Sequence, residues 1–221
     1  FVGDIEKINI CDDKFLTSKF LKENNFSYPK TCLLNDINID IDYPLILKSR
    51  KGCGSKDIKI IKSNSDLPSE RKEEYILQEY LEGDEYTAGV YLGENKEIKG
   101  SCVFKRKLKG GSTFFAERIV DKDMEDYLGS IAKALGMKYV NIQFRLKNGL
   151  PCPFEFNGRF SGTTGMIKKV FNAPDMMLRE LILDQDVLEV SNQEKFYVMR
   201  YYDEIYADLS SVEKLLQRSK I

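Results

Sequence analysis

The feature that most restricts the fold is a basic, glycine-rich loop between two short apolar segments, in residues 43–62 (YPLILKSRKGCGSKDIKIIK). Residues 44–47 are apolar and residues 58–61 are rich in β-branched side chains, so both segments predict strands. Gly52 and Gly54 allow the loop to bend sharply and to expose backbone N–H groups. Neither GxxxxGK[ST] nor GxGxxG is present, and no helix is predicted after the loop. The segment is therefore either an ordinary hairpin loop or a phosphate-binding loop that does not use a helix N-terminus.

The composition limits the classes of partner and the compartment. The 221 residues suffice for one large domain or two small lobes, and 34 basic against 35 acidic residues leave a formal charge of -1. This balance argues against nucleic acid as a partner. The sequence has no apolar run of membrane length, no signal segment, and five scattered cysteines without a CxxC pair. We therefore expect a cytoplasmic protein with reduced thiols, no membrane contact and no zinc site.

The chain contains no histidine. This absence excludes a Ser-His-Asp triad, a Cys-His pair and every metal site that is ligated by histidine. An enzyme of this composition would work with lysines, arginines, carboxylates and a hard cation. Phosphoryl transfer is the reaction class that needs little else.

The remaining pattern predicts helices interspersed with mostly antiparallel strands. Helices are predicted over residues 12–23, 63–74, 123–135 and 174–184, and from residue 210 onward. Asp12 or Asp13 is the expected N-cap of the first helix and Asp123 that of the third, and Gly136 lies just past the end of the third. Further strands are predicted over residues 75–81, 85–92, 97–107, 113–120, 139–146, 152–157 and 196–207. The fold class is therefore α+β in two lobes, with the boundary near Gly83.

The segment 141–164 (NIQFRLKNGLPCPFEFNGRFSGTT) predicts a hairpin that carries oxygen ligands on one face. Alternation puts Glu155 and Asn157 on one face of their strand, with Phe154 and Phe156 on the other. A two-residue turn would place Gln143 and Glu155 on opposite faces. A three-residue loop over 147–149 brings them to the same face, and we therefore predict that loop.

The resulting cluster contains only oxygen ligands, with Arg159 just beyond it. A hard cation such as Mg²⁺ is often held by one or two carboxylates together with phosphate oxygens. One glutamate flanked by the amides of Gln143 and Asn157 therefore fits a magnesium–nucleotide site. The alternative is a half-buried hairpin with a polar face toward solvent.

Several segments, in their order along the chain, resemble the ATP-grasp superfamily, and within it the large subunit of carbamoyl-phosphate synthase and related carboxylate–amine ligases. They are DDKFLTSKFLKENNFSYPKT, PLILKSRKGCGSKDIKII, LQEYLEGDEYTAGV, NIQF and FEFNGRFSGTT. The resemblance covers nearly the whole chain. It implies an ATP-grasp fold of two lobes that clamp ATP, with residues 1–82 as a lid lobe that includes the N-terminal helix and the Gly-rich loop. Residues 83–221 would form a C-terminal lobe with the metal site.

The resemblance also implies the roles of individual residues. Lys14 and Lys48 resemble the basic pair on the α/β-phosphates. The loop that includes Gly52, Gly54 and Ser55 resembles the flap over the β/γ-phosphates. The segment Gln78, Glu79, Tyr80 and Leu81 resembles the adenine edge, and Glu85 the carboxylate that binds the ribose hydroxyls. Gln143, Glu155 and Asn157 match the ligands of Mg²⁺ (or Mn²⁺), and Arg159 the arginine on the phosphate side. Lys48 and Arg159 are the implied catalytic residues.

Two departures from the family pattern affect these expectations. The family usually reads N-P-R after the metal glutamate, whereas this chain has Gly158 before Arg159. Gly frees the backbone that Pro would fix, so the placement of Arg159 is less constrained. The family also carries a Rossmann-like N-terminal domain before the first helix, and this chain begins where that domain would end. We expect that domain, or a partner subunit, to be missing from the sequence.

The function implied is that of a Mg-ATP-dependent ligase, which activates a carboxylate as an acyl phosphate for attack by an amine. A carbamoyl-phosphate-synthase-type reaction with bicarbonate and ammonia is one alternative, and a nucleotide-binding module without turnover is another. Arg106, Arg145 and Arg200 lie on predicted strands, where they would either anchor a substrate carboxylate or form surface ion pairs.

Overall fold

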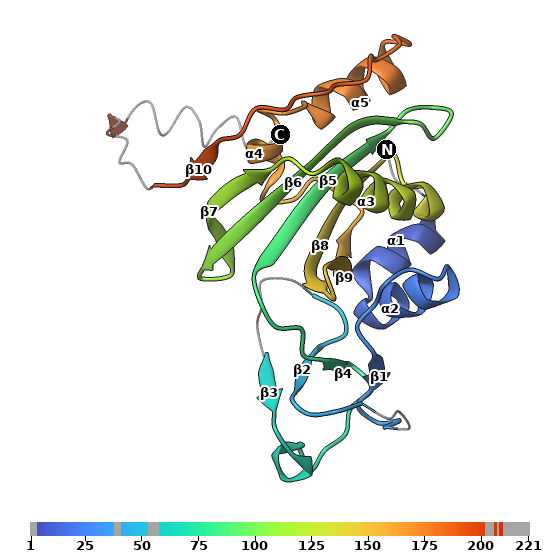
Figure 1. The fold of residues 1–221 in the computed structure, drawn as a ribbon, viewed down its shortest axis with the longest axis vertical. Helices are drawn as coiled ribbons and strands as arrows, with labels where there is room; N and C mark the ends of the chain where they lie inside the picture. Colours follow the sequence, from blue (N-terminus) through green and yellow to red (C-terminus); the bar gives the residue numbers. More distant parts are fainter. Residues whose placement is uncertain (1–3, 38–40, 53–57, 202–205, 207, 210–221) are drawn as a thin grey trace.

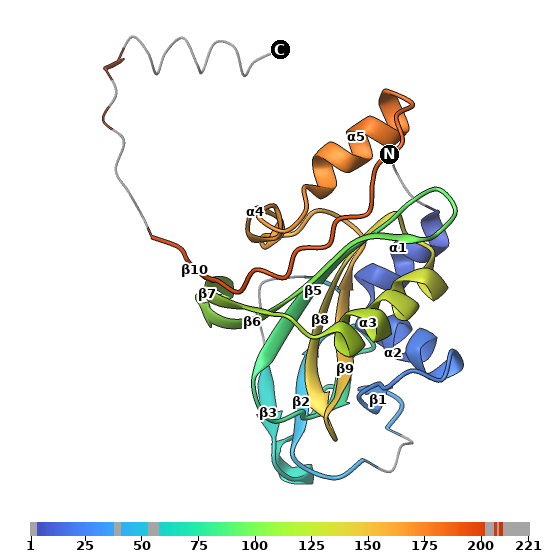
Figure 2. The ribbon, with the colours of Figure 1, turned by 45° about the horizontal axis from the view of Figure 1, so that its top comes forward.

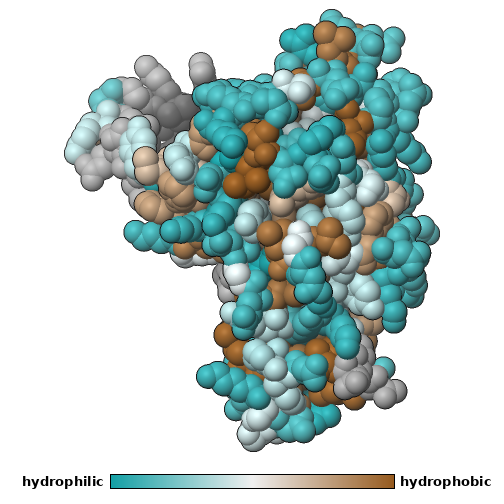
Figure 3. Space-filling model, in the orientation of Figure 1, coloured by the Kyte–Doolittle hydropathy of each residue, from teal (hydrophilic) through white to brown (hydrophobic). Residues whose placement is uncertain are grey.

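The computed structural model describes residues 4–37, 41–52, 58–201, 206, 208 and 209. Within these residues the chain forms two antiparallel sheets, a four-stranded one and a six-stranded one, with helices packed against the larger (Figure 1). The predicted α+β class with antiparallel sheets is thus confirmed. In the same view as Figure 1, the small sheet forms the narrower lower part of the surface (Figure 3).

The small sheet contains β1 (Thr31–Leu33), β2 (Leu45–Ser49), β3 (Lys59–Ile61) and β4 (Tyr75–Glu79), in the order β1-β4-β2-β3. Strands β2 and β3 are antiparallel neighbours, as predicted for the segments that flank the glycine-rich loop. The centre of that loop, including Gly54 and Ser55, lies outside the described residues. Buried aliphatic side chains such as Leu45, Leu47 and Ile61 form the core of this sheet.

The helix predicted over residues 63–74 is wrong. Only a single 3-10 turn forms there, η1 (Asn64–Asp66), in which the Asp66 carboxylate accepts the backbone N–H groups of Lys62 and Ser63. The next residue, Leu67, is extended. Pro68 explains this, because the residue before a proline is driven out of the helical region.

The large sheet has the strand order β10-β7-β6-β5-β8-β9. Its strands are β5 (Glu85–Leu92), β6 (Ile98–Lys109), β7 (Ser112–Ile119), β8 (Tyr139–Lys147), β9 (Leu150–Asn157) and β10 (Tyr197–Met199). Of the strand predicted over residues 196–207, only β10 forms in the described part. The chain passes from the small sheet to the large one through a turn at Gly83, which has a φ of 92°.

The two faces of the large sheet carry different helices (Figure 2). Helices α1 (Ile5–Asp12), α2 (Lys14–Glu23) and α3 (Lys122–Leu135) pack on one face around buried residues such as Leu21, Leu128 and Phe156. Helices α4 (Thr164–Ile167) and α5 (Ala173–Ile182) cover the other face. The two N-terminal helices thus contact the large sheet, whereas the sequence groups them with the lid; the division at residue 82 itself stays a prediction.

The residues at the helix ends can be compared with the predicted caps. Asp13 caps α2 through its side chain, which accepts the backbone N–H of Phe15, and Gly136 ends α3 with a φ of 70°, both as predicted. The N-cap of α3 is Asp121 rather than Asp123, because the helix begins at Lys122, two residues earlier than that cap implies. Helix α1 was not predicted from the sequence. The helix predicted from residue 210 lies outside the described residues.

Two further expectations concern the cysteines and membranes. Cys11, Cys32, Cys102 and Cys152 are buried free thiols, and burial raises the pKa of each. Among the helices that the structure describes, none has the length and apolar character that crossing a bilayer would require.

Candidate functional site

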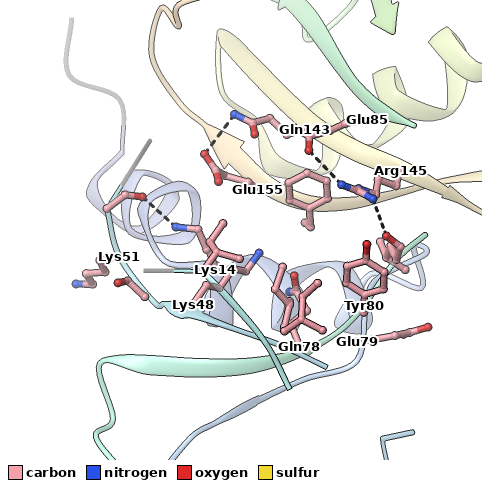
Figure 4. Close-up of a pocket in the computed structure, with 17 residues that line it drawn as sticks. Lys14, Lys48, Lys51, Gln78, Glu79, Tyr80, Glu85, Gln143, Arg145 and Glu155 are labelled. Carbon is pink, nitrogen blue, oxygen red and sulfur yellow. Dashed lines mark hydrogen bonds and ion pairs between the residues drawn. The ribbon is translucent and has the colours of Figure 1, made fainter. Parts of the chain in front are cut away.

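A cavity of about 450 Å³ lies between the small sheet and the part of the large sheet that faces it (Figure 4). Many of the residues predicted for the site line it: Lys14, Lys48, Gly52, Gln78, Glu79, Tyr80, Leu81, Glu85, Gln143 and Glu155. The lysines lie on one side of the cavity, and Glu85, Gln143 and Glu155 lie on the other. The described lining does not include Asn157 or Arg159.

Two buried ammonium groups dominate the electrostatics of the lysine side. Lys14 and Lys48 are 8% and 7% exposed, and neither makes an ion pair with a described residue. Lys14 Nζ donates to the carbonyl oxygen of Gly52 at 2.9 Å, and Lys48 Nζ lies 5.2 Å from the centre of the Phe154 ring. Burial, followed by the positive charge of Lys14, lowers the pKa of Lys48 from 10.5 to about 7, although Glu155 and Glu85 act in the opposite direction. Such a pair favours the entry of an anion.

The start of the glycine-rich loop is held in place by the N-cap of α2. Asp13 is 1% exposed, and its second carboxylate oxygen accepts Arg50 Nε at 2.7 Å. The backbone N–H of Lys14 also donates to the carbonyl of Arg50 at 3.0 Å. One aspartate therefore fixes both the helix that carries Lys14 and the strand end that leads into the loop.

The hairpin of β8 and β9 brings Gln143 and Glu155 together, but not through the predicted three-residue loop. Lys147 pairs with Leu150, so the turn contains only Asn148 and Gly149, with φ values of 53° and 81°. These are the values of a type I′ turn, which the Asn-Gly sequence strongly favours. The predicted loop length is therefore wrong.

A β-bulge restores the pairing that the turn alone would prevent. Phe144 pairs with Pro153, but Gln143 pairs with Glu155, so Phe154 is an extra residue on β9. Pro153 has no N–H to donate to the ladder, and proline within a sheet is typical of bulges. The bulge also turns the Phe154 side chain into the cavity beside Glu155, whereas simple alternation predicts the opposite face. Phe156 is buried in the core, as predicted.

Glu155 is the centre of the predicted metal cluster. Its Oε1 accepts the amide nitrogens of Gln143 at 3.3 Å and of Asn157 at 3.4 Å, and Oε2 has no partner in the described part of the chain. No group of three or more His, Cys, Asp or Glu side chains suited to a metal occurs among the described residues. A cation here would thus have one carboxylate and would need phosphate oxygens as well, which is how Mg²⁺ is often bound. The donor set fits Mg²⁺ or Mn²⁺ that arrives with a nucleotide.

Residues 11–163 match the ATP-grasp domain family. The chain belongs to the ATP-grasp family.

Similar proteins come from several branches of this family. The chain is 26% identical to the carbamoyl phosphate synthase large chain of a Thermoanaerobacter species, in a match that covers 95% of this chain and 22% of that protein. It is 24% identical to D-alanine–D-alanine ligase A of Bacillus cereus, with coverage of 85% and 71%. The ATP-grasp chain thus spans less than a quarter of the length of the carbamoyl phosphate synthase large chains that it matches.

The fold is also found in a solved structure, that of carboxyaminoimidazole ribonucleotide synthase from Aspergillus clavatus complexed with ATP. The two chains superpose with a TM-score of 0.69 at 14% identity, over 85% of this chain and 55% of that one. The ATP-grasp fold that the resemblance predicted is thereby confirmed.

In this ATP-grasp domain, the end of β4 and the residues that follow it form one wall of the cavity. The side chain of Gln78 is buried and donates to Thr31 Oγ1 at 2.8 Å, so one of its amide N–H groups is already used. The Glu79 carboxylate is paired with Lys147 at 2.6 Å. Leu81 accepts Arg145 through its carbonyl, and its backbone N–H has no partner among the described residues. Leu81 therefore offers a backbone donor at the cavity.

Arg106 and Arg145 both form ion pairs with Glu85. Arg106 approaches Glu85 Oε1 at 2.5 Å and Arg145 approaches Oε2 at 3.5 Å. From sequence, these arginines were either substrate anchors or surface ion pairs, and here they form partly buried ion pairs. Arg200 instead donates to the carbonyl of Gly162. Arg159 is exposed and donates to the carbonyl of Phe160 at 3.2 Å.

The apolar walls of the cavity were not predicted from the sequence. They are formed by Ile46, Ile58 and Ile60 from the small sheet and by Phe154 from the large one. The alternation of side chains within residues 45–49 and 58–61 could have predicted these walls, because it places Ile58 and Ile60 on one face. In the structure both isoleucines are 44% exposed. Exposed isoleucines that share one face indicate an apolar surface open to a ligand.

Proposed function

We propose that the cavity binds Mg-ATP and that the chain is the nucleotide-binding part of a ligase that joins a carboxylate to an amine. The observation that carries the proposal is the pair of buried lysines, Lys14 and Lys48, across the cavity from Glu155, whose Oε2 has no partner among the described residues. A triphosphate with a divalent cation satisfies both sides of the cavity at once. Membership of the ATP-grasp family and the likeness to a structure complexed with ATP support the same ligand.

The nucleoside would lie between the two sheets. The apolar walls provided by Ile46, Ile60 and Phe154 suit a planar base, and the backbone N–H of Leu81 would donate to the edge of the adenine. Glu85 would accept the ribose hydroxyls through its carboxylate while it remains paired with its arginines. Gln78 would support this wall from within the small sheet, where its amide donates to Thr31 Oγ1.

The phosphates would lie on Lys14 and Lys48, beneath the loop that includes Gly52, Gly54 and Ser55. Glu155 and the amide of Asn157 would hold the cation, which would neutralise negative charge on the phosphates. Arg159 is proposed as a further cation for the transferring phosphate. Its exposed position and the glycine before it leave its side chain free to turn toward the cavity.

The reaction proposed has two steps. A carboxylate oxygen of the acceptor attacks the γ-phosphorus of ATP, and ADP leaves with the electrons of the broken bond. An amine then attacks the acyl carbon, and phosphate leaves. Lys48 and Arg159 would neutralise charge that develops on the phosphoryl oxygens in the first step. The protein contributes alignment and charge rather than a nucleophile of its own.

The match with carbamoyl phosphate synthase favours one specific alternative, in which bicarbonate is the carboxylate and ammonia the amine. The match with D-alanine–D-alanine ligase favours amino-acid substrates instead. Because the chain spans less than a quarter of the synthase chain, a further domain or subunit is proposed to complete the acceptor site. A nucleotide-binding module without turnover is the third possibility.

Measurement of Mg-ATP binding by calorimetry, followed by ADP release against panels of carboxylates and amines, tests the proposal. We expect saturable binding that is lost without Mg²⁺, and ADP release that depends on an acceptor. Stimulation by bicarbonate and ammonia would identify the synthase-type reaction. Binding without stimulation by any acceptor would identify the non-catalytic module, and a failure to bind Mg-ATP would overturn the proposal.

A further inference from the structure

One arginine, Arg106, contacts two of the polar side chains that line the cavity on the side of the large sheet, Glu85 and Gln143. Arg106 lies on β6, and its side chain is 8% exposed. Its Nε and Nη2 groups donate to Glu85 Oε1 at 3.1 Å and 2.5 Å, and Nη2 also donates to Gln143 Oε1 at 2.6 Å. Nη1 donates to Oγ1 of the buried Thr113 at 3.4 Å. The guanidinium therefore connects strands β5, β7 and β8.

The chemistry of these groups fixes the orientation of the Gln143 amide. A guanidinium has donors only, whereas an amide has one acceptor end and one donor end. With Arg106 on its oxygen, Gln143 must direct its Nε2 away, and Nε2 does donate to Glu155 Oε1. Gln143 thus presents a donor to Glu155, and its oxygen is already used by Arg106.

We propose that Arg106 is a positioning residue for both halves of the nucleotide site. It would hold Glu85 directly, where the ribose is proposed to bind. It would hold Glu155 indirectly, because it locks the Gln143 amide so that the hydrogen bond to Oε1 leaves Oε2 toward the cation. On this view Gln143 orients the metal carboxylate and does not ligate the metal. The inference rests on the proposed binding of Mg-ATP.

The geometry distinguishes this role from that of a simple ion pair. An ion pair with Glu85 requires only charge, which a lysine would also supply. The simultaneous contacts to Glu85, Gln143 and Thr113 require the planar fork of arginine. Arg106→Lys should therefore keep the charge and the fold while it releases the Gln143 amide.

The experiment compares Arg106→Lys with Arg179→Lys, a matched control on α5 in which the arginine pairs only with Asp175 and is 52% exposed. Calorimetry would measure the affinities for Mg-ATP and for magnesium with inorganic triphosphate. Electron paramagnetic resonance would measure Mn²⁺ affinity in the presence of ADP. We expect Arg106→Lys to weaken Mn²⁺ binding roughly tenfold, as is usual when a group behind a metal ligand is removed. We also expect it to reduce the preference for ATP over triphosphate.

Gln143→Met provides a second test, in which it is combined with Arg106→Lys in a double variant. If Arg106 acts through Gln143, the losses of Mn²⁺ affinity in Gln143→Met and Arg106→Lys should be clearly less than additive in the double variant. Additive losses, or an Arg106→Lys variant that matches Arg179→Lys in both readouts, would overturn the inference while wild-type Mg-ATP binding stands. A wild-type protein that binds neither Mg-ATP nor Mn²⁺ with ADP would overturn the proposed function itself.

Discussion

The side chain of Lys48 lies in surroundings that disfavour its positive charge. Its ammonium is buried beside a second ammonium, and no described carboxylate pairs with it, so burial lowers its pKa to about 7. A polyphosphate removes this disadvantage because it supplies the missing negative charge. The residue is therefore more suited to binding an anion than to stabilising the empty protein.

This situation predicts a pH dependence of anion binding. In the free protein Lys48 loses its proton above about pH 7, and bound triphosphate would raise its pKa again. Binding should then take up a proton, and affinity should fall as pH rises from 7 toward 9, by at most about tenfold per unit. Calorimetry with magnesium triphosphate in buffers of different ionisation enthalpy measures both effects.

The control is Lys48→Arg, because a guanidinium stays charged across this range. Its triphosphate affinity should show no fall between pH 7 and 9 and no proton uptake. A wild-type affinity as flat as that of Lys48→Arg would show that Lys48 does not titrate in this window.

A second prediction separates the nucleoside from the phosphates. Glu85→Gln retains the shape of the side chain but replaces a charged acceptor for the ribose, and a hydrogen bond to a charged group contributes ~1.5–3 kcal/mol. ATP should bind about tenfold more weakly or worse. Inorganic triphosphate should bind equally well or more tightly, because Arg106 and Arg145 lose a negative partner. Lys48→Met should weaken both ligands, and equal losses in Glu85→Gln would remove the ribose assignment.

A third prediction concerns the metal carboxylate. Glu155→Gln is nearly isosteric and leaves the hairpin intact, but it removes the carboxylate whose Oε2 has no partner in the described part of the chain. Mg²⁺-dependent ATP turnover should be largely lost, with no change in the unfolding midpoint. Asn157→Asp is the comparison, since it adds a carboxylate beside Glu155 and should retain Mg²⁺ dependence. Full turnover of Glu155→Gln at saturating Mg²⁺ would contradict the assignment.

At the scale of elements, the hairpin of β8 and β9 shows what sequence periodicity can and cannot predict. The two strands and the polar residues on each of them follow from alternation, whereas the shared face of Gln143 and Glu155 was predicted only together with a loop length. The turn length and the bulge do not, because several combinations of the two satisfy the same parity. The Asn-Gly sequence and Pro153 were the local signals that favour the observed combination.

The type I′ turn predicts a local cost of substitution. Gly149 has a φ of 81°, and a Cβ there would meet no atom within 4 Å, so Gly149→Ala tests backbone strain alone. We expect a loss of about 1–2 kcal/mol in the free energy of unfolding. Gly162→Ala is the matched control, because Gly162 also has open space but no left-handed φ. Denaturant unfolding of both variants measures the difference, and equal midpoints would argue against the turn.

At the scale of the whole molecule, side chains near the end of β8 connect the large sheet to the small one. Lys147 pairs with Glu79 on β4 at 2.6 Å, and Arg145 donates to the carbonyls of Leu81 and Gly83 in the connection between the sheets. Sequence alone indicated two lobes and a break near Gly83. It did not reveal these contacts, or the packing of α1 and α2 on the large sheet, because neither depends on a local pattern.

These contacts predict how the cavity is kept in shape. Lys147→Met should accelerate amide hydrogen exchange in residues 76–83, because β4 loses its ion pair with the large sheet. The unfolding midpoint should change little, since a partly exposed pair typically contributes less than ~1 kcal/mol. Lys122→Met is the control, because Lys122 pairs only within α3, with Asp126. Exchange in residues 76–83 that is equal in both variants would show that the pair does not restrain β4.

The bulge at Phe154 also changes how densely a strand can supply a binding site. A regular strand offers a cavity one side chain in every two residues. Here two successive residues, Phe154 and Glu155, face the same space, so an aromatic wall beneath Lys48 and a metal carboxylate are adjacent in the sequence. Because the extra residue lies outside the ladder, deleting it would leave Gln143 opposite Glu155. Deletion of Phe154 would thus remove the aromatic contribution to this ATP-grasp site and leave the ionic one.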